Sequence, residues 1–375
     1  MAQIKPPFET FARIKVIGVG GGGGNALARM IFSRIHGVEF IAINTDAQDL
    51  HKCGAPTKIH IGKNLSRGLG AGMNPEIGRQ AATDTKEEIQ EALKGSDMVF
   101  ITAGMGGGTG SGAGPVVAEI AKDVGALAVG VVTKPFSFEG PQRMRIAEES
   151  WHVLRDKVDA LITISNDRLL SIIDRKTPVL EAFAIVDDIL RQGVQGISDL
   201  ITIPGIINVD FADVKAIMAN SGSALMGIGK ASGEDRAIEA AKIAINSPLL
   251  DVSIEGAKGV LFNVAGGPDL AMAEINEAAK VITENIDSNA KVIFGAVQDD
   301  KLKKGEIKIT VIATGFNGAS SPKQTGPTLF EDVAANGSAN TSNHIQKAIR
   351  PTELVDEGLD DDTLDIPAFI RRKMK

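Results

Sequence analysis

Two glycine-rich clusters, each placed directly after a run of β-forming residues, constrain this chain more than any other feature. Residues 20–25 (GGGGGN) follow residues 14–17 (IKVI), and residues 104–112 (GMGGGTGSG) follow residues 98–101 (MVFI). Glycine reaches positive φ without strain and has no Cβ to hold a ligand away from the backbone. A strand that ends in such a loop and leads into a helix directs several backbone N–H groups and the positive end of the helix dipole at one point. Two of these loops predict a single polyphosphate bound from two sides.

The segments around these clusters alternate between β-forming and helix-forming residues from Arg13 onward. This rhythm predicts an α/β fold with a doubly wound parallel sheet. Pro75, with Glu76 in the first turn, predicts the start of one helix. The predicted strands are residues 14–18, 38–44, 98–102, 126–132 and 159–164, and further helices are predicted at residues 25–34 and 115–123.

A long helix is predicted to begin at Thr177 and Pro178, with threonine as the N-cap and proline at the first helical position. Its apolar residues keep a helical period with few charges between them, so we expect it to pack between two units. The second unit is predicted as a smaller α/β domain without a phosphate-type glycine loop. Its predicted helices are residues 235–246 and 270–286, and its predicted strands are residues 259–264, 292–297 and 307–313.

The two ends of the chain differ in composition from this body. Residues 1–12 are predicted to form a flexible arm. Residues 317–363 are first rich in Ser, Asn, Thr, Gly and Pro and then acidic, which predicts a disordered linker. The final segment, residues 364–375, joins three large apolar residues to a basic end, which is typical of a docking peptide.

Bulk composition argues against several classes of function. The chain has 375 residues, enough for two domains, and its net charge of −7 comes without a Lys/Arg cluster interleaved with aromatics, so nucleic acid is not an expected partner. The single cysteine, Cys53, excludes an intramolecular disulfide and fits a reducing compartment. No uncharged apolar run reaches the roughly 18 residues that a membrane span needs, and no signal-peptide core is present in residues 1–10. We therefore expect a cytoplasmic protein without direct membrane insertion.

The first cluster alone does not separate a dinucleotide from a nucleoside triphosphate. Residues 18–23 satisfy the pattern GxGxxG, and Asp46 follows the next predicted strand, where a Rossmann fold places its ribose-binding acid. An NAD-dependent oxidoreductase is therefore one candidate. The second cluster favours a triphosphate, because it adds backbone donors and the hydroxyls of Thr109 and Ser111. The Walker lysine of GxxxxGK[ST] is missing, which excludes the P-loop NTPases.

Two pairs of side chains four residues apart allow either a binding role or a purely structural one. Glu139 and Arg143 could bind ribose and phosphate, but their spacing alone favours an exposed ion pair. Phe183 and Asp187 share a face of the long helix and could stack on a purine and accept from guanine donors. Taken separately, each of these two is more often a core aromatic or a solvated carboxylate.

Asp210 and Asp213, just after the long helix, form a third pair. Carboxylates three residues apart can orient a water for attack on phosphorus, or they can cap a helix and stabilise its dipole. Their spacing does not decide between these roles. The five histidines are scattered without a ligand spacing, so no protein-held metal is expected, and any Mg²⁺ would arrive on the nucleotide phosphates.

Several short motifs together make the resemblance to one family specific. Residues 104–112 look like the signature loop of the tubulin/FtsZ family. The chain resembles the FtsZ branch of this family, the bacterial tubulin homologues that build the division ring, from about residue 12 to residue 316 and again at the tail. The further motifs that carry the resemblance are residues 20–25, 44–47 (NTDA), 68–75, 138–140 (FEG), 208–213 (NVDFAD) and 364–372.

The resemblance implies roles for the matching residues. The phosphate-binding residues that it implies are Gly21, Gly22, Gly23, Gly24, Asn25, Ala71, Gly72, Gly108, Thr109 and Gly110. Those implied for the rest of GTP are Glu139 at the ribose, Arg143 elsewhere on the nucleotide, and Asn166, Phe183 and Asp187 at guanine. Asp210 and Asp213 would enter the next subunit's site as catalytic residues. Two positions depart from the family pattern: Ser111 keeps the hydroxyl of the usual threonine, and Asp187 replaces the asparagine of some relatives.

The resemblance also implies a tubulin/FtsZ-like domain organisation and a function. Residues 13–176 would form the GTP-binding domain, residues 177–219 the central helix and catalytic loop, and residues 220–316 the C-terminal α/β domain. The implied function is assembly-dependent hydrolysis of GTP to GDP, with Mg²⁺ on the nucleotide, by a protein that polymerises head-to-tail into the division ring. Its tail, from Leu364 to Lys373, would bind membrane-tethering and regulatory division proteins at the inner face of the membrane. A GTP-binding module that never polymerises and the oxidoreductase are the alternatives.

Overall fold

The computed structural model describes residues 12–170, 173, 176–203, 205–247, 253–299 and 302–316. These residues fall within one unit, residues 1–320. Nearly all of the predicted N-terminal arm, and the whole of the predicted linker and docking peptide, lie outside the described residues and stay predictions.

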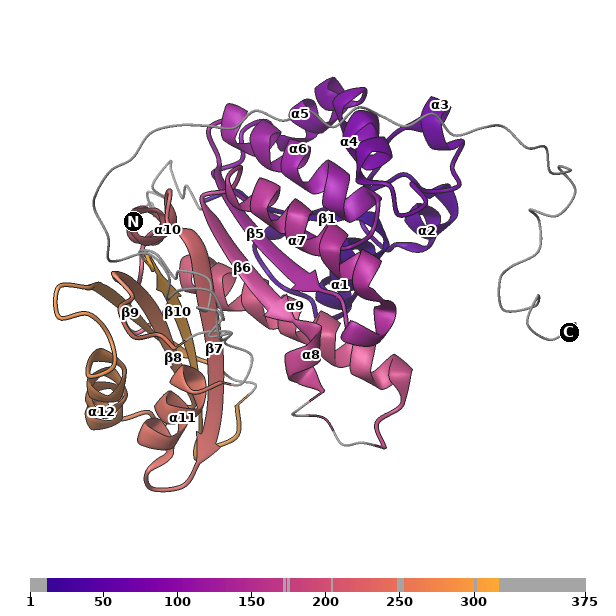
Figure 1. Ribbon diagram of the computed structural model, residues 1–375. Helices are drawn as coiled ribbons and strands as arrows, with labels where there is room; N and C mark the ends of the chain where they lie inside the picture. The colour runs from indigo at the N-terminus through magenta and orange to yellow at the C-terminus, as the bar shows by residue number, and fades with distance from the viewer. Residues whose placement is uncertain are drawn as a thin grey trace, which may run out of the picture. The chain divides into compact units, whose positions relative to one another are not determined.

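A ten-stranded sheet organises the described residues, in the order β3-β2-β1-β4-β5-β6-β7-β10-β8-β9 (Figure 1). The strands from β3 to β6 in this order are parallel, as predicted. β10 runs antiparallel to both of its neighbours, whereas β8 and β9 pair in parallel. The strands are β1 (Ile14–Val19), β2 (Val38–Asn44), β3 (Thr57–His60), β4 (Met98–Gly104), β5 (Leu127–Lys134), β6 (Ala160–Ser165), β7 (Gly222–Ser232), β8 (Gly259–Gly266), β9 (Lys291–Gln298) and β10 (Glu306–Thr314).

Helices cover both faces of the parallel strands, which confirms the doubly wound prediction. α1 and α9 pack into one core cluster on one face, and α4, α5, α6 and α7 pack into a second cluster on the other (Figure 1). No helix in the described ranges combines the length and hydropathy that a membrane span requires. The helices are α1 (Gly20–Phe32), α2 (Ala47–Lys52), α3 (Lys63–Ser66), α4 (Pro75–Thr83), α5 (Lys86–Leu93), α6 (Thr109–Asp123), α7 (Pro141–Arg155), α8 (Asn166–Leu169), α9 (Val179–Thr202), α10 (Phe211–Met218), α11 (Arg236–Ile245) and α12 (Met272–Thr283), with a 3-10 turn η1 (Ser137–Glu139).

The central helix α9 links the parallel part to the C-terminal strands. Its buried residues Val194 and Ile197 belong to the same core cluster as Met226 of β7 and Leu261 of β8. α11 and α12 pack with the C-terminal strands in a separate third cluster. β6 and β7 join the two parts of the sheet through only three register pairs. The two α/β parts therefore share one sheet and one helix, and the exact domain boundaries stay predictions.

Both glycine clusters run into helices earlier than predicted. α1 begins at Gly20 rather than at residue 25, and α6 begins at Thr109 rather than at residue 115. The reason is close packing, which overrides the low helix propensity of glycine. A Cβ on Gly23 would lie 2.4 Å from the carbonyl oxygen of Thr102 in β4, and one on Gly112 would lie 1.9 Å from a backbone oxygen of α4. Only glycine lets α1 approach the sheet, and α6 approach α4, so closely.

Three prolines mark helices in different ways. Pro75 opens α4 as predicted, and the Asn74 side chain caps the helix by accepting from the Glu76 N–H at 3.0 Å. Pro115 lies inside α6, which contradicts the prediction that this helix begins there. Pro178 is the N-cap of α9, so the helix begins one residue later than predicted.

β7 is a strand that the sequence pattern did not predict. It contains Gly227 and Gly229, which weaken a β-forming pattern. A Cβ on either glycine would lie 1.9 Å from a backbone oxygen of α11, so both are needed for that helix to approach the sheet. α2, β3, α3, α5 and α7 were also not predicted. The predicted helices and strands of residues 220–316 are all present, with ends that differ by at most three residues.

Candidate functional site

A cavity of about 320 Å³ opens where β1 and β4 end. The strand order reverses between these two strands, because β2 and β3 lie on one side and β5 and β6 on the other. Doubly wound sheets bind their ligands at such a switch point. The predicted site residues that line the cavity are Gly21, Gly22, Asn25, Gly108, Thr109, Gly110, Glu139, Arg143, Asn166, Phe183 and Asp187.

The two glycine clusters meet at this cavity. Gly20 has a φ of +72°, and a Cβ there would come within 3.0 Å of the Gly110 nitrogen. A Cβ on Gly22 would lie 3.3 Å from Cα of Gly104. The first turns of α1 and α6 therefore touch backbone to backbone. Their N–H groups, which have no partner within their own helix, open on the same cavity.

Four of the phosphate contacts that the family resemblance implies do not line the cavity. Gly23 is buried against β1 and β4, and Gly24 lies farther along α1. Ala71 and Gly72 lie in the loop before α4, where a Cβ on Gly108 would meet the Ala71 Cβ at 2.7 Å. This loop therefore supports Gly108 from behind, and direct contact of its residues with a ligand stays a prediction.

Glu139 and Arg143 form the ion pair that their spacing favours, and both also line the cavity. The Glu139 carboxylate accepts from Arg143 Nη1 at 2.6 Å and from the Phe136 N–H at 2.9 Å. These bonds tie the guanidinium to the turn η1, so that its position at the cavity wall is fixed. The ion pair and the binding role are therefore compatible, and Arg143 brings positive charge to a cavity lined with backbone donors.

Asn166, Phe183 and Asp187 lie at the part of the cavity formed by α8 and α9. The Phe183 ring packs edge-on against Phe136, with centroids 5.5 Å apart, and 40 % of the residue is exposed. Asn166 is buried, and its Oδ1 has no hydrogen-bond partner among the residues that the structure describes. A buried acceptor without a partner is rare in native proteins and fits a ligand that donates a hydrogen bond. An open aromatic face beside such acceptors suits a purine.

Burial raises the pKa of the Asp187 carboxyl from 3.8 to about 6, and the charge of Arg29 offsets part of this rise. The desolvated carboxylate therefore gains from any ligand that donates hydrogen bonds to it. Guanine offers two adjacent donors, N1–H and the N2 amino group, whereas adenine offers no such pair at this edge. The aromatic ring, the amide and this carboxylate together fit a guanine nucleotide.

Asp210 and Asp213 are not part of this cavity. Asp210 is the N-cap of α10, and its carboxylate accepts from the Asp213 N–H at 2.8 Å, so its structural role is real. Asp213 makes no side-chain hydrogen bond or ion pair with the described residues.

Asp210 and Asp213 both follow the C-terminal end of α9, whereas Asp187 lies near its start. At 1.5 Å per residue, about 22 Å of helix separates Asp187 from Thr202. Figure 1 shows α10 at the far end of α9 from α8.

Asp46 does not lie where a dinucleotide site would need it. Its carboxylate caps α2 by accepting from the N–H groups of Gln48 and Asp49, at 2.9 and 3.0 Å. Asp46 does not line the cavity. The residue that supported the oxidoreductase alternative therefore has a structural role in this loop.

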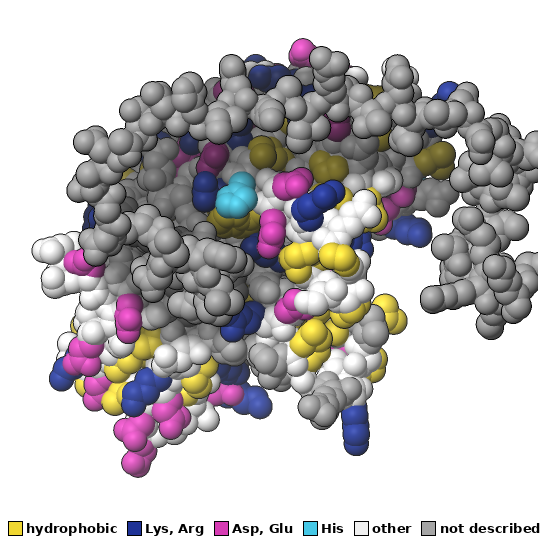
Figure 2. All heavy atoms as spheres, viewed as in Figure 1, with side chains coloured by type: hydrophobic (Ala, Val, Ile, Leu, Met, Phe, Trp, Pro, Cys, Tyr) yellow, Lys and Arg dark blue, Asp and Glu magenta, His cyan; other side chains and the backbone are white. Residues whose placement is uncertain are grey.

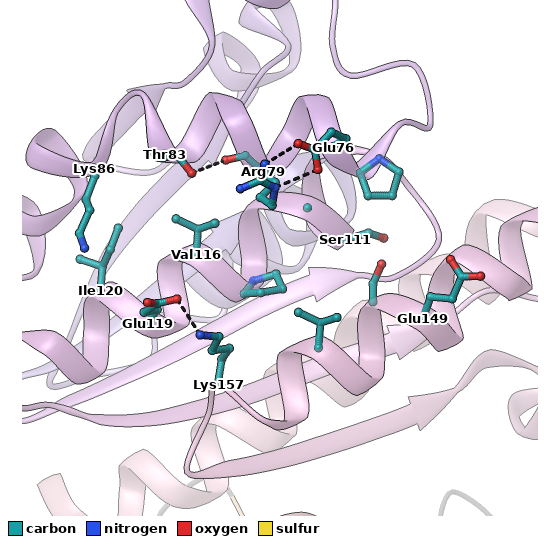
Figure 3. Close-up of a pocket in the computed structure, with 15 residues that line it drawn as sticks. Glu76, Arg79, Thr83, Lys86, Ser111, Val116, Glu119, Ile120, Glu149 and Lys157 are labelled. Atoms are coloured by element: carbon teal, nitrogen blue, oxygen red, sulfur yellow. Dashed lines mark hydrogen bonds and ion pairs between the residues drawn. The ribbon is translucent and has the colours of Figure 1, made fainter.

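A larger cavity, of about 430 Å³, lies between α4, α6 and α7 (Figure 3). Of the residues predicted to contact phosphate, it contains only Ser111, whose hydroxyl accepts from the Gly106 N–H at 2.9 Å and does not line the smaller cavity. Its acidic and basic side chains pair with each other or with close neighbours: Glu76 with Arg79, Glu119 with Lys157 at 2.9 Å, and Lys86 with Asp123 at 3.2 Å. The Glu139–Arg143 pair of the smaller cavity is balanced in the same way, so charge does not distinguish the two cavities. The larger cavity lacks the meeting of two glycine-rich helix starts, so size alone does not identify the site.

The face drawn in Figure 2 shows no basic patch of the kind that binds nucleic acid among the described residues. On the face drawn in Figure 2, acidic and basic side chains of the described residues are interspersed. Within the described ranges, no three His, Cys, Asp or Glu side chains gather as a metal site would require. A magnesium ion at the cavity would therefore take most of its oxygen ligands from phosphate and water.

Nine lining residues of the cavity had no individual role predicted for them. They are Val19, Gly20, Gly104, Met105, Gly107, Thr133, Pro135, Val186 and Leu190. Gly20, Gly104, Met105 and Gly107 belong to the two glycine clusters that were predicted to bind phosphate. Extending the first cluster back into the strand that precedes it would have found Val19. Val186 and Leu190 follow Phe183 at helical spacing on α9, which is the signal that would have found them.

The comparisons with known proteins agree with this geometry. A model of the GTPase domain of the Tubulin/FtsZ family matches residues 13–174, and a model of the C-terminal domain of the FtsZ family matches residues 222–317. The structure is similar to an empty FtsZ dimer from M. jannaschii, with 48 % sequence identity, a TM-score of 0.79, and coverage of 82 % of this chain and 90 % of that one. The chain belongs to the FtsZ family.

Two further structures place this FtsZ-family chain within the wider fold. A tryptophan-to-tyrosine mutant of the M. jannaschii FtsZ is also 48 % identical, with a TM-score of 0.78 over 82 % of this chain and 92 % of that one. CetZ2 from Haloferax volcanii, solved as a GTPγS-bound protofilament, is 22 % identical, with a TM-score of 0.69 over 80 % of this chain and 92 % of that one, and it supports the fold alone. As an FtsZ-family member, the chain carries a tubulin-type GTPase domain, which implies guanine-nucleotide binding. This finding removes the oxidoreductase from consideration.

Proposed function

We propose that this protein hydrolyses GTP in a site that two subunits complete between them, and that it assembles head-to-tail into filaments. The separation of the cavity from Asp210 and Asp213 along α9 carries this proposal. The cavity has backbone donors, a cation and base-binding groups, but the carboxylates suited to orient a water lie at the far end of the same subunit. A second copy, placed head-to-tail, brings its own Asp210 and Asp213 to the cavity.

Binding of GTP follows from the groups that line the cavity. The N-terminal turns of α1 and α6 donate backbone N–H groups to the phosphates, and Arg143 adds charge. Glu139 accepts from the ribose hydroxyls. Phe183 stacks on the base, while Asn166 and Asp187 accept from guanine. Contact of Gly23, Gly24, Ala71 and Gly72 with the phosphates is proposed from the family resemblance, and Ala71 also supports Gly108 from behind.

Catalysis then depends on the neighbouring subunit. Asp213, whose carboxylate has no partner among the described residues, orients and deprotonates the attacking water, and Asp210 holds the turn that presents it. A head-to-tail contact does not close on itself, so it produces an open filament. Mg²⁺ on the phosphates would neutralise charge there. The dimer formed by the 48 % identical FtsZ of M. jannaschii supports self-association.

The cellular role that we propose is that of the family: a cytoplasmic filament that forms the division ring. Its docking peptide, from Leu364 to Lys373, would link the filament to membrane-tethering and regulatory partners. Deletion of residues 364–375 should leave GTP hydrolysis unchanged and abolish recovery of these partners in a pull-down. Recovery of the same partners by the shortened chain would contradict this assignment.

The specific GTPase rate, measured against protein concentration, tests the assembly requirement. We expect a threshold followed by a rise, together with sedimentable polymer in GTP and much less in GDP. A specific rate that does not depend on concentration would exclude the shared site and would favour a GTP-binding module that acts as a monomer.

A further inference from the structure

A buried hydroxyl pair connects the cavity to the loop after β2. Thr45 lies in this loop and is 0 % exposed. Its Oγ1 is 2.6 Å from Oγ1 of Thr109, the first residue of α6, which lines the cavity. Thr45 itself does not line the cavity, so any influence on a ligand must pass through Thr109.

The backbone of Thr45 is held in place from several sides. Its carbonyl oxygen accepts from the Ser66 hydroxyl at 2.9 Å and lies 3.4 Å from Nε2 of His60. On one side of it, the Asn44 side chain accepts from the Asp46 N–H at 3.2 Å. These contacts fix the Thr45 backbone beside Thr109, and within the described residues the Thr45 hydroxyl has Thr109 as its partner.

Counting hydrogens decides which hydroxyl donates. Each threonine hydroxyl carries one hydrogen, and neither has another hydrogen-bond partner among the residues that the structure describes. If Thr109 donated to Thr45, the hydrogen of the fully buried Thr45 would have no acceptor, which is costly. If Thr45 donates, its hydrogen is satisfied, and the hydrogen of Thr109 is free to point into the cavity.

We infer that Thr45 is a positioning residue for the nucleotide: it fixes the Thr109 hydroxyl as a donor to a phosphate oxygen. Without Thr45, the Thr109 hydroxyl has no bond that orders it, so binding must fix its rotation as well, and affinity falls. The inference rests on the proposed function, because it takes the cavity as the phosphate site. Thr45 itself binds no ligand, but it makes the hydroxyl of Thr109 a hydrogen-bond donor to one.

The test measures GDP affinity of the nucleotide-free full-length protein, at concentrations below assembly, by isothermal titration. Thr45→Val should weaken binding about tenfold, near the lower end of what one hydrogen bond to a charged group contributes. Thr45→Ser keeps the hydroxyl and should bind like the unaltered protein. Thr102→Val is the matched control, because Thr102 is equally buried and its hydroxyl has no partner among the described residues.

A double-mutant comparison separates positioning from a packing defect. Thr109→Val should lose at least as much affinity as Thr45→Val, and the double variant should lose no more than Thr109→Val alone. The inference would be overturned if the fold-losses of the two single variants multiplied in the double variant. Unaltered affinity in a folded Thr45→Val protein would also overturn it. If Thr45→Val fails to fold, weak binding by Thr45→Ser would overturn it equally. Failure of the unaltered protein to bind GDP would instead contradict the proposed function.

Discussion

The buried carboxylate of Asp187 predicts that guanine-nucleotide affinity falls as pH is lowered through about 6. Its pKa is raised to about 6 because burial disfavours the charged form. Only the ionised carboxylate accepts from both guanine donors, so protonation competes with binding. With this pKa, the ionised fraction falls from about 0.9 at pH 7 to about 0.1 at pH 5. The apparent affinity for GDP should therefore drop about tenfold over this range.

Asp187→Asn is the matched control, because a carboxamide has a similar shape and does not titrate. GDP affinity of both proteins should be measured from pH 5 to pH 8 below the assembly threshold, so that protonation of the phosphates affects the two equally. The ratio of the two affinities isolates Asp187. A ratio that stays constant over this range would refute the burial argument.

The raised pKa of Asp187 also predicts how the stability of the nucleotide-free protein depends on pH, with a sign opposite to that of nucleotide affinity. Because the folded pKa of Asp187 lies above its unfolded value, the folded state binds the proton more tightly, and its contribution to stability falls as pH rises from 4 to 7. Asp187→Asn should therefore raise the free energy of unfolding in urea at pH 7 more than at pH 5.

Three further variants test separate parts of the account. Asp213→Asn should leave GDP affinity within about twofold while lowering kcat by about 100-fold or more, as for loss of a water-orienting group; equal loss of both would place Asp213 in its own subunit's binding site. Phe183→Ala should weaken GDP binding by about 5- to 150-fold, the range of one base–aromatic stack, and Phe183→Tyr should not. Gly227→Ala places a Cβ 1.9 Å from the Ala244 carbonyl oxygen and should lower stability by about 1–3 kcal/mol in urea unfolding, whereas Gly54→Ala meets no atom within 4 Å and should not.

Local patterns in the sequence located the phosphate end of the site but not its exact geometry. The strands before each glycine cluster were predicted to within two residues, because β-forming residues and glycine turns act over short distances. The early starts of α1 and α6 were missed, because they depend on backbone contacts such as Gly23 with Thr102, between residues far apart in sequence. β7 was missed for the same reason.

The roles of individual side chains could be assigned only once the fold was known. The spacing of Glu139 and Arg143 favoured a simple ion pair, and that pair exists, but only the fold places it at the cavity. Asp210 is a helix cap, as the structural interpretation of its position predicted. The separation of Asp210 from the cavity depends on the length and direction of α9. Sequence spacing carries no information about that direction.

A mixture of two inactive variants tests the shared site most directly. Asp213→Asn binds GTP but supplies no water-orienting carboxylate. Gly107→Trp supplies this carboxylate but has its cavity filled, because Gly107 lines the cavity and a Cβ there meets no atom within 4 Å. We predict that each variant alone hydrolyses GTP at background rates and that an equimolar mixture regains a substantial part of the activity, since Asp213 of one subunit serves the nucleotide of the other. A mixture that stays as inactive as its components would contradict a site completed between subunits.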